Sequence, residues 1–129
     1  MKEDRFPVAV VQFERNEEEN YLQVAFGEHD GEPERYMIVQ RCIEPDEQDR
    51  EMGLDGLYTE TADEALTGYE VCKYISWDGS QLVFDFDNGQ PQRLTLDLSG
   101  AKYPEKELIE YLRLTGQDVF ADLTARKRK

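Results

Sequence analysis

Residues 82–98 read LVFDFDNGQPQRLTLDL, in which two runs of alternating apolar and polar residues flank a turn-forming centre. Alternation with period two is typical of strands that bury one face, and Asn-Gly is a strong signal for a hairpin turn. A three-residue loop, Asp87-Asn88-Gly89, keeps the apolar residues of both runs on one face, whereas a two-residue loop places them on opposite faces. The sequence therefore predicts an antiparallel hairpin with the three-residue loop, Leu82 opposite Leu94, and Gly89 in the left-handed conformation.

Strand patterns recur along the chain on the N-terminal side of this hairpin. Apolar or alternating runs predict strands at residues 8–14, 21–26, 36–43, 57–60 and 69–77, and polar segments predict connections at 16–20 and 27–34. The run 36–43 is the strongest of these. Its two faces are Tyr36, Ile38, Gln40 and Cys42 on one side and Met37, Val39, Arg41 and Ile43 on the other. Pro45 ends it, since proline has no N–H to donate to a ladder.

One convincing helix follows the hairpin. Pro104 suits its first turn and Gly116 suits its C-cap. Its buried face is predicted from helical spacing: Leu108, Ile109, Leu112 and Thr115. The apolar pair Val119-Phe120 is expected to dock beyond the helix. Together these patterns predict an α+β fold, a mainly antiparallel β-sheet with one C-terminal helix packed on it.

The length of 129 residues suits one domain, which we predict over residues 1–125. A basic tail, RKRK, follows at residues 126–129. We interpret it as a solvated end, with self-association through an acidic face or residual RNA affinity as alternatives. The N-terminal residues lack the pattern of a signal peptide. Cys42 and Cys72 are interpreted as buried free thiols in a reducing cytoplasm, while the sequence leaves a disulfide between them open.

The charge of the chain restricts its partners. It carries 29 acidic against 15 basic residues, a formal net charge of −14. Nucleic-acid binding requires Lys and Arg to displace counterions from phosphates, so nucleic acids and anionic membrane surfaces are disfavoured partners. An excess of acid favours rapid encounter with a basic partner, although it also serves solubility alone.

Motifs for catalysis and for metal or cofactor binding are absent from the sequence. The only histidine, His29, lies in a polar loop, which argues against His-based catalysis and a multi-His metal site. Residues 85–96 begin like a calcium loop, but Gly89 comes one position early and Leu96 stands where the glutamate is needed. We predict no catalytic residue, metal or cofactor. A small carboxylate-dependent hydrolase remains the weaker alternative, because paired carboxylates are abundant.

The densest acidic stretch follows the predicted strand 36–43. Four carboxylates, Glu44, Asp46, Glu47 and Asp49, lie in a connection that contains a proline. A rigid strand that presents a carboxylate-rich loop suits the binding of Lys and Arg. The alternative is that Asp46 caps a short helical turn and that the other acids are solvated. Both interpretations are open at this point.

The same stretch resembles a known family. Residues 40–58, QRCIEPDEQDREMGLDGLY, resemble the signature of the bacterial immunity protein 10 family: an aliphatic strand ending in Gln-Arg, then E-x-DEQD, a spacer, G-x-D and an aromatic residue. Gly68-Tyr69 resembles a second family element, and LVFDF at 82–86 resembles the strand that follows it. The resemblance extends over residues 36–98, about half the chain.

The resemblance implies a small cytoplasmic bacterial protein, not an enzyme, that is encoded beside a polymorphic toxin and neutralises it by binding. A nuclease toxin would suit the acidic composition, because its substrate groove is basic. We assign Gln40, Arg41 and Gly53 to folding. The predicted partner-binding residues are Glu44, Asp46, Glu47, Asp49, Asp55, Tyr58 and Trp77, the last two as exposed aromatic anchors. The alternative function is an acidic adaptor of unknown partner.

Overall fold

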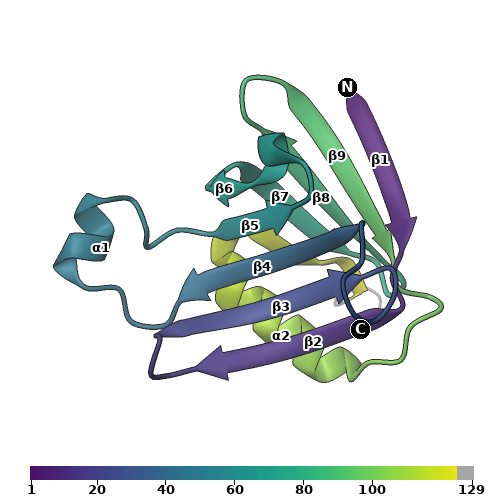
Figure 1. The fold of residues 1–129 in the computed structure, drawn as a ribbon, viewed down its shortest axis with the longest axis horizontal. Helices are drawn as coiled ribbons and strands as arrows, with labels where there is room; N and C mark the ends of the chain where they lie inside the picture. Colours follow the sequence, from purple (N-terminus) through teal and green to yellow (C-terminus); the bar gives the residue numbers. More distant parts are fainter. Residues whose placement is uncertain (125–129) are drawn as a thin grey trace.

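A computed structural model describes residues 1–124 of the protein. Two five-stranded sheets and one long helix make up its body (Figure 1). The first sheet contains, in spatial order, β1 (Lys2–Pro7), β9 (Pro91–Asp97), β8 (Gln81–Asp87), β7 (Cys72–Trp77) and β10 (Phe120–Asp122). The second sheet contains β2 (Val10–Asn16), β3 (Tyr21–Gly27), β4 (Tyr36–Cys42), β5 (Tyr58–Thr61) and β6 (Gly68–Tyr69).

The α+β class is confirmed, whereas the expectation of one sheet is wrong. The helical elements are α1 (Glu47–Glu51), α2 (Glu105–Gly116) and the 3₁₀ turns η1 (Glu64–Leu66) and η2 (Gln117–Val119). The basic tail predicted at 126–129 lies outside the described residues. No helix within residues 1–124 is long and apolar enough to cross a membrane.

The β8–β9 hairpin confirms the predicted loop length but corrects its register. The loop is 88–90, one residue later than predicted, so Leu82 lies opposite Leu96 rather than Leu94. Asp87 extends the strand and its Oδ1 accepts the Gly89 N–H at 3.2 Å, which stabilises the turn at this later position. Gly89 has a φ of 95°, as its place in the turn requires. Both registers keep the apolar residues on one face.

The two outer strands of the first sheet pair in parallel, which the sequence did not indicate. β1 runs parallel to β9, and β10 runs parallel to β7. Only Phe6 of the six β1 residues is buried, so this strand has no alternating pattern, and its charges protect an open edge. The chain then changes sheets within two residues: Val8 N–H bonds to Asp97 O of the first sheet, and Ala9 N–H bonds to Gly27 O of the second.

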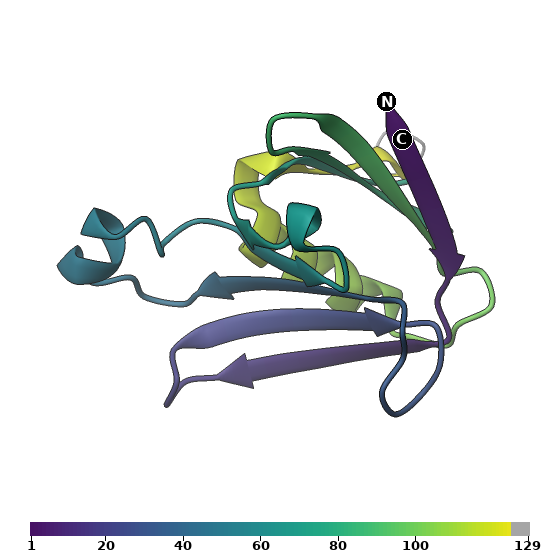
Figure 2. The ribbon, with the colours of Figure 1, turned by 45° about the horizontal axis from the view of Figure 1, so that its top comes forward.

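Helix α2 packs between the sheets. It contacts β3 and β4 of the second sheet and β10 of the first, and Figure 2 shows it in the space where the two sheets diverge. Its buried residues confirm the predicted face: Leu108, Ile109, Leu112 and Thr115. The C-cap lies one residue later than predicted, because Gln117, not Gly116, takes the positive φ of 50°. The predicted docking beyond the helix is confirmed, since Phe120 begins β10.

One apolar core joins both sheets and corrects the placement of Trp77. The rings of Phe26 and Phe84 meet across the sheets with centroids 6.5 Å apart. Trp77 was expected to be an exposed anchor but is 0% exposed, and it packs edge-on against Tyr103. The reason is a bulge between Cys72 and Tyr74, which brings both Cys72 and Trp77 to the inner face of a central strand.

Candidate interaction surface

The connection from β4 to β5 carries α1 out from the body of the molecule (Figure 1). We call residues 44–55 the acidic arm, since they contain six acidic residues and one basic residue. Glu44, Asp46 and Glu47 are exposed, and Asp49 and Asp55 are partly buried. The predicted partner-binding carboxylates therefore lie together on one projecting segment.

Two of these carboxylates build the arm. Asp46 Oδ1 accepts the Asp49 N–H at 2.8 Å, and Asp49 Oδ2 accepts the Asp46 N–H at 3.0 Å, a reciprocal capping box. The interpretation of Asp46 as a helix cap is thus confirmed. Within residues 1–124, the side-chain carboxylates of Glu44 and Glu47 cap no helix and accept no backbone N–H. Their charge is therefore available to a partner.

Gly53 ends α1, in agreement with its assignment to folding. It has a φ of 73°, and its N–H bonds to Arg50 O at 3.2 Å. The Leu54 N–H bonds to Asp49 O at 2.8 Å, which completes a Schellman motif. A left-handed residue is needed at this position, and glycine adopts that conformation without a steric cost.

A second acidic segment lies at the base of the arm. Asn20, in the β2–β3 turn, accepts the Glu44 N–H with Oδ1 at 2.9 Å and donates from Nδ2 to Glu44 O at 2.8 Å. This pair of bonds joins the turn to the arm. Together they form what we call the acidic end, nine carboxylates from two segments: Glu17, Glu18, Glu19, Glu44, Asp46, Glu47, Asp49, Glu51 and Asp55. The sequence interpretation treated the turn only as a polar connection.

The acidic end borders a sheet face of different composition. Helix α2 covers one face of the second sheet, and Figure 1 shows the other face in front of it. We call this other face of β2–β6 the tyrosine face. Besides Gly27, strand alternation and register place fourteen residues on it: Val10, Gln12, Glu14, Asn16, Tyr21, Gln23, Ala25, Tyr36, Ile38, Gln40, Cys42, Tyr58, Glu60 and Tyr69. Four of the seven tyrosines of the chain are among them.

The two carboxylates on the tyrosine face hold its tyrosines in place. Glu60 accepts hydrogen bonds from the hydroxyls of Tyr36 at 3.3 Å and Tyr58 at 3.0 Å, and Glu14 accepts from Tyr21 at 2.8 Å. Burial and then Glu60 raise the pKa of Tyr36 and of Tyr58, and the hydrogen bond to Glu14 is the main cause that raises the pKa of Tyr21. All three hydroxyls therefore remain protonated donors at neutral pH.

Two hollows mark the ends of the tyrosine face. One, of about 180 Å³, lies under the 27–33 loop against Val10, Pro33 and Ile38. The other, of about 150 Å³, lies where the face meets the acidic arm. Its lining is mostly polar, charged and aromatic: Glu19, Asn20, Tyr21, Gln40, Arg41, Cys42, Asp49, Leu54, Tyr58 and Tyr69. We call this second one the polar hollow.

Of the two predicted aromatic anchors, the structure places only Tyr58 on this surface. Its ring lies against that of Tyr69, with centroids 5.0 Å apart. Trp77 lies in the core, away from the acidic arm. The sequence interpretation missed Tyr21, Tyr36 and Tyr69. A signal was present for Tyr36 alone, in the run 36–43, whose two faces are both largely apolar although only one faces the core.

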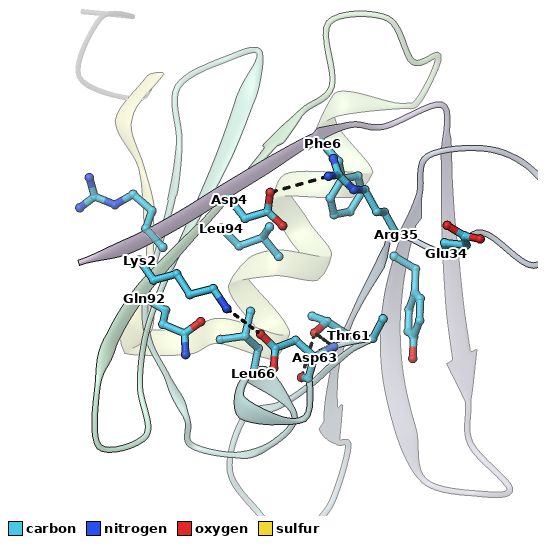
Figure 3. Close-up of a pocket in the computed structure, with 13 residues that line it drawn as sticks. Lys2, Asp4, Phe6, Glu34, Arg35, Thr61, Asp63, Leu66, Gln92 and Leu94 are labelled. Carbon is cyan, nitrogen blue, oxygen red and sulfur yellow. Dashed lines mark hydrogen bonds and ion pairs between the residues drawn. The ribbon is translucent and has the colours of Figure 1, made fainter.

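A third pocket, shown in Figure 3, opens between β1, β9 and the η1 segment. Phe6, Leu66 and Leu94 contribute to its apolar lining. Its charged groups neutralise one another: Lys2 lies 3.9 Å from Asp63, and Arg35 lies 4.0 Å from Asp4. The lining contributes three basic and three acidic residues, so the pocket has no excess of either charge.

Within residues 1–124, no group of three or more His, Cys, Asp and Glu side chains is arranged to hold a metal ion. Cys42 and Cys72 are free thiols, as interpreted from the sequence. Burial raises the pKa of the Cys72 thiol to about 12, so it is not a nucleophile at neutral pH.

The surface thus consists of a tyrosine-rich centre without Lys or Arg, next to a projecting acidic end. No curated protein matches the chain in a sequence comparison. The profile of the family described as Immunity protein 10 (Imm10) matches residues 7–101, which include both sheets except β1 and β10. The matched region contains the Gln40–Tyr58 signature, the acidic arm and the whole tyrosine face. The chain belongs to the Immunity protein 10 family.

Proposed function

We propose that this protein binds the toxin domain encoded beside it and neutralises that toxin by covering its active or substrate-binding surface. Family membership carries this proposal, since residues 7–101 match Immunity protein 10. The chain acts by binding and not by turnover. Its partner is another protein, and no cofactor takes part.

The acidic end supports a basic partner surface. Its nine carboxylates, together with the net charge of −14, favour encounter with Lys and Arg over other surfaces. A nuclease toxin suits this charge, because a groove that binds phosphates is basic. Glu44 and Glu47 are the residues of the arm best placed to contact the toxin, while Asp46 and Asp49 hold the arm in shape.

Co-expression tests the proposal. The toxin domain from the adjacent gene is expressed in a bacterial host alone, with this protein, and with an unrelated acidic protein of similar size. We expect growth only with this protein, and recovery of a complex from the rescued cells. Continued killing in its presence would contradict the proposed function.

A further inference from the structure

We infer that the tyrosine face is the surface that docks on the toxin, and that the polar hollow receives a Lys or Arg side chain of that partner. This inference rests on the proposed function and specifies its contact surface. The tyrosine face, not the acidic arm alone, then supplies the binding energy, and the acidic end supplies the orientation.

The outer faces of the two sheets differ in charge. On the first sheet, the outer face contains many charged residues that neutralise one another: Arg93 lies 2.6 Å from Asp85 and 3.8 Å from Glu3. Because its charges are paired, such a face is stable when exposed to solvent. The tyrosine face has no Lys or Arg among its fourteen positions, in a chain of which 34% is charged. Depletion of charge and enrichment in tyrosine are characteristic of the core of a protein interface.

The tyrosine side chains of this face are held in place by their neighbours. Tyr36 and Tyr58 share the carboxylate of Glu60, and Tyr58 also stacks obliquely on Tyr69. The aromatic side chains are therefore ordered before any partner arrives. Binding through ordered rings costs little side-chain entropy, which is why tyrosine is effective at contact surfaces.

The polar hollow suits a cationic group of the partner. It combines the rings of Tyr21, Tyr58 and Tyr69 with the carboxylates of Glu19 and Asp49. Arg41 also lines it, but its guanidinium donates to the Thr115 and Asp55 carbonyls. Aromatic faces attract cations. The Asp49 carboxylate accepts the Asp46 N–H and the Cys42 thiol through Oδ2, which leaves Oδ1 as an acceptor for a further donor. A guanidinium or ammonium group satisfies both features, whereas a purely apolar side chain would leave the carboxylate desolvated.

The charge at both ends of the tyrosine face disfavours a second copy of this chain as the occupant. The acidic end borders one end of the tyrosine face, and the 28–34 loop, with Glu28, Asp30, Glu32 and Glu34, borders the other. Two copies packed face to face would bring carboxylates against carboxylates in either orientation. With a basic partner, each of these contacts instead pairs opposite charges and is attractive.

Calorimetry with the toxin domain from the adjacent gene tests the inference. The test variant is Tyr58→Ala with Tyr69→Ala. The matched control is Tyr74→Ala, which removes a tyrosine of similar exposure, 40% against 38% for Tyr69, from the outer face of the first sheet. We expect the double variant to lose affinity by about 30-fold or more, the effect of removing a hot spot, and the control to change it less than about twofold.

A second variant tests the hollow without disturbing the arm. Asp49→Asn removes the charge but keeps an oxygen that accepts the Asp46 N–H. We expect a loss of about 10-fold, the size of one charge-assisted contact. Thermal unfolding of each variant shows whether the fold is retained, and Tyr58→Phe, which keeps the ring, is expected to bind within about threefold of the wild type.

The outcomes separate the two proposals. If the wild-type protein fails to bind the toxin, the proposed function is wrong and the inference falls with it. If the wild-type protein binds and the folded double variant binds equally well, the function stands and the tyrosine face is not the interface. A free protein that sediments as a dimer, and as a monomer only in the double variant, would show that this face binds a second copy and would overturn the inference.

Discussion

The guanidinium of Arg41 donates from Nε to the backbone carbonyl of Thr115 at 2.6 Å, across 74 residues of sequence. Its Nη1 donates to the Asp55 carbonyl at 3.2 Å. Thr115 lies in the last turn of α2, where carbonyls lack intrahelical partners and a cation is favoured. One side chain of the family signature therefore fixes both the root of the acidic arm and the C-terminal helix, which lies outside the matched region.

Substitution of Arg41 tests this connection. We expect Arg41→Ala to lower the free energy of unfolding by about 2 kcal/mol, because two partly buried carbonyls lose a charged donor. Urea unfolding measures this change. Arg41→Lys places one donor at the same site and should recover part of the stability, and equal stability of all three proteins would show that the contact is not structural.

The capping box gives a local prediction. We expect Asp46→Ala to destabilise α1 by about 1 kcal/mol, since the Asp49 N–H loses its acceptor. Hydrogen exchange of that amide, followed by NMR, should become several-fold faster. Asp46→Asn keeps an acceptor oxygen and should leave the exchange rate nearly unchanged; equal acceleration in both variants would point to charge and not to capping.

The acidic arm should act mainly on the association rate. We expect Glu47→Lys to slow binding of the toxin several-fold at low salt and to reduce the salt dependence, because exposed charges steer encounter and are screened over about 10 Å at 0.1 M salt. Glu110→Lys is the matched control, since it makes the same charge change on an exposed position of α2. Stopped-flow association rates distinguish them, and identical rates would place the arm outside the encounter surface.

The Cys72 thiol predicts a pH dependence of stability. Burial raises the pKa of the folded thiol to about 12, above that of the unfolded chain. Its contribution to stability is complete below about pH 9 and decreases as pH rises toward 12, because only the unfolded thiol ionises in that range. Over this range, the free energy of unfolding of the wild type, measured with urea, should fall relative to that of Cys72→Ala. A constant difference would show that the thiol is accessible.

Periodicity predicted those elements that bury one face. β3, β8, β9 and α2 each alternate between the core and a polar side, so their sequences repeat with period 2 or 3.6. β1 was missed because five of its six residues are exposed. The division into two sheets was missed for a different reason, since the change of sheet at Val8 and Ala9 depends on partners far away in sequence.

The site was predicted in part. The carboxylates that follow β4 could be found because they are adjacent in sequence to one another and to a strong strand. The tyrosine face could not be predicted, because its residues come from five strands and are brought together only by the register of the sheet. Trp77 was misplaced because a bulge changes the phase of β7, and a bulge is not visible as a pattern of residue types.

Fluorine NMR of the protein labelled with 3-fluorotyrosine tests the central claim most directly. The seven tyrosines give seven probes, four on the tyrosine face and three elsewhere. On addition of the toxin domain from the adjacent gene, we predict that the resonances of Tyr21, Tyr36, Tyr58 and Tyr69 shift or broaden, and that those of Tyr74, Tyr103 and Tyr111 remain in place. A complex in which Tyr74 responds and the four tyrosines of the face do not would contradict the account.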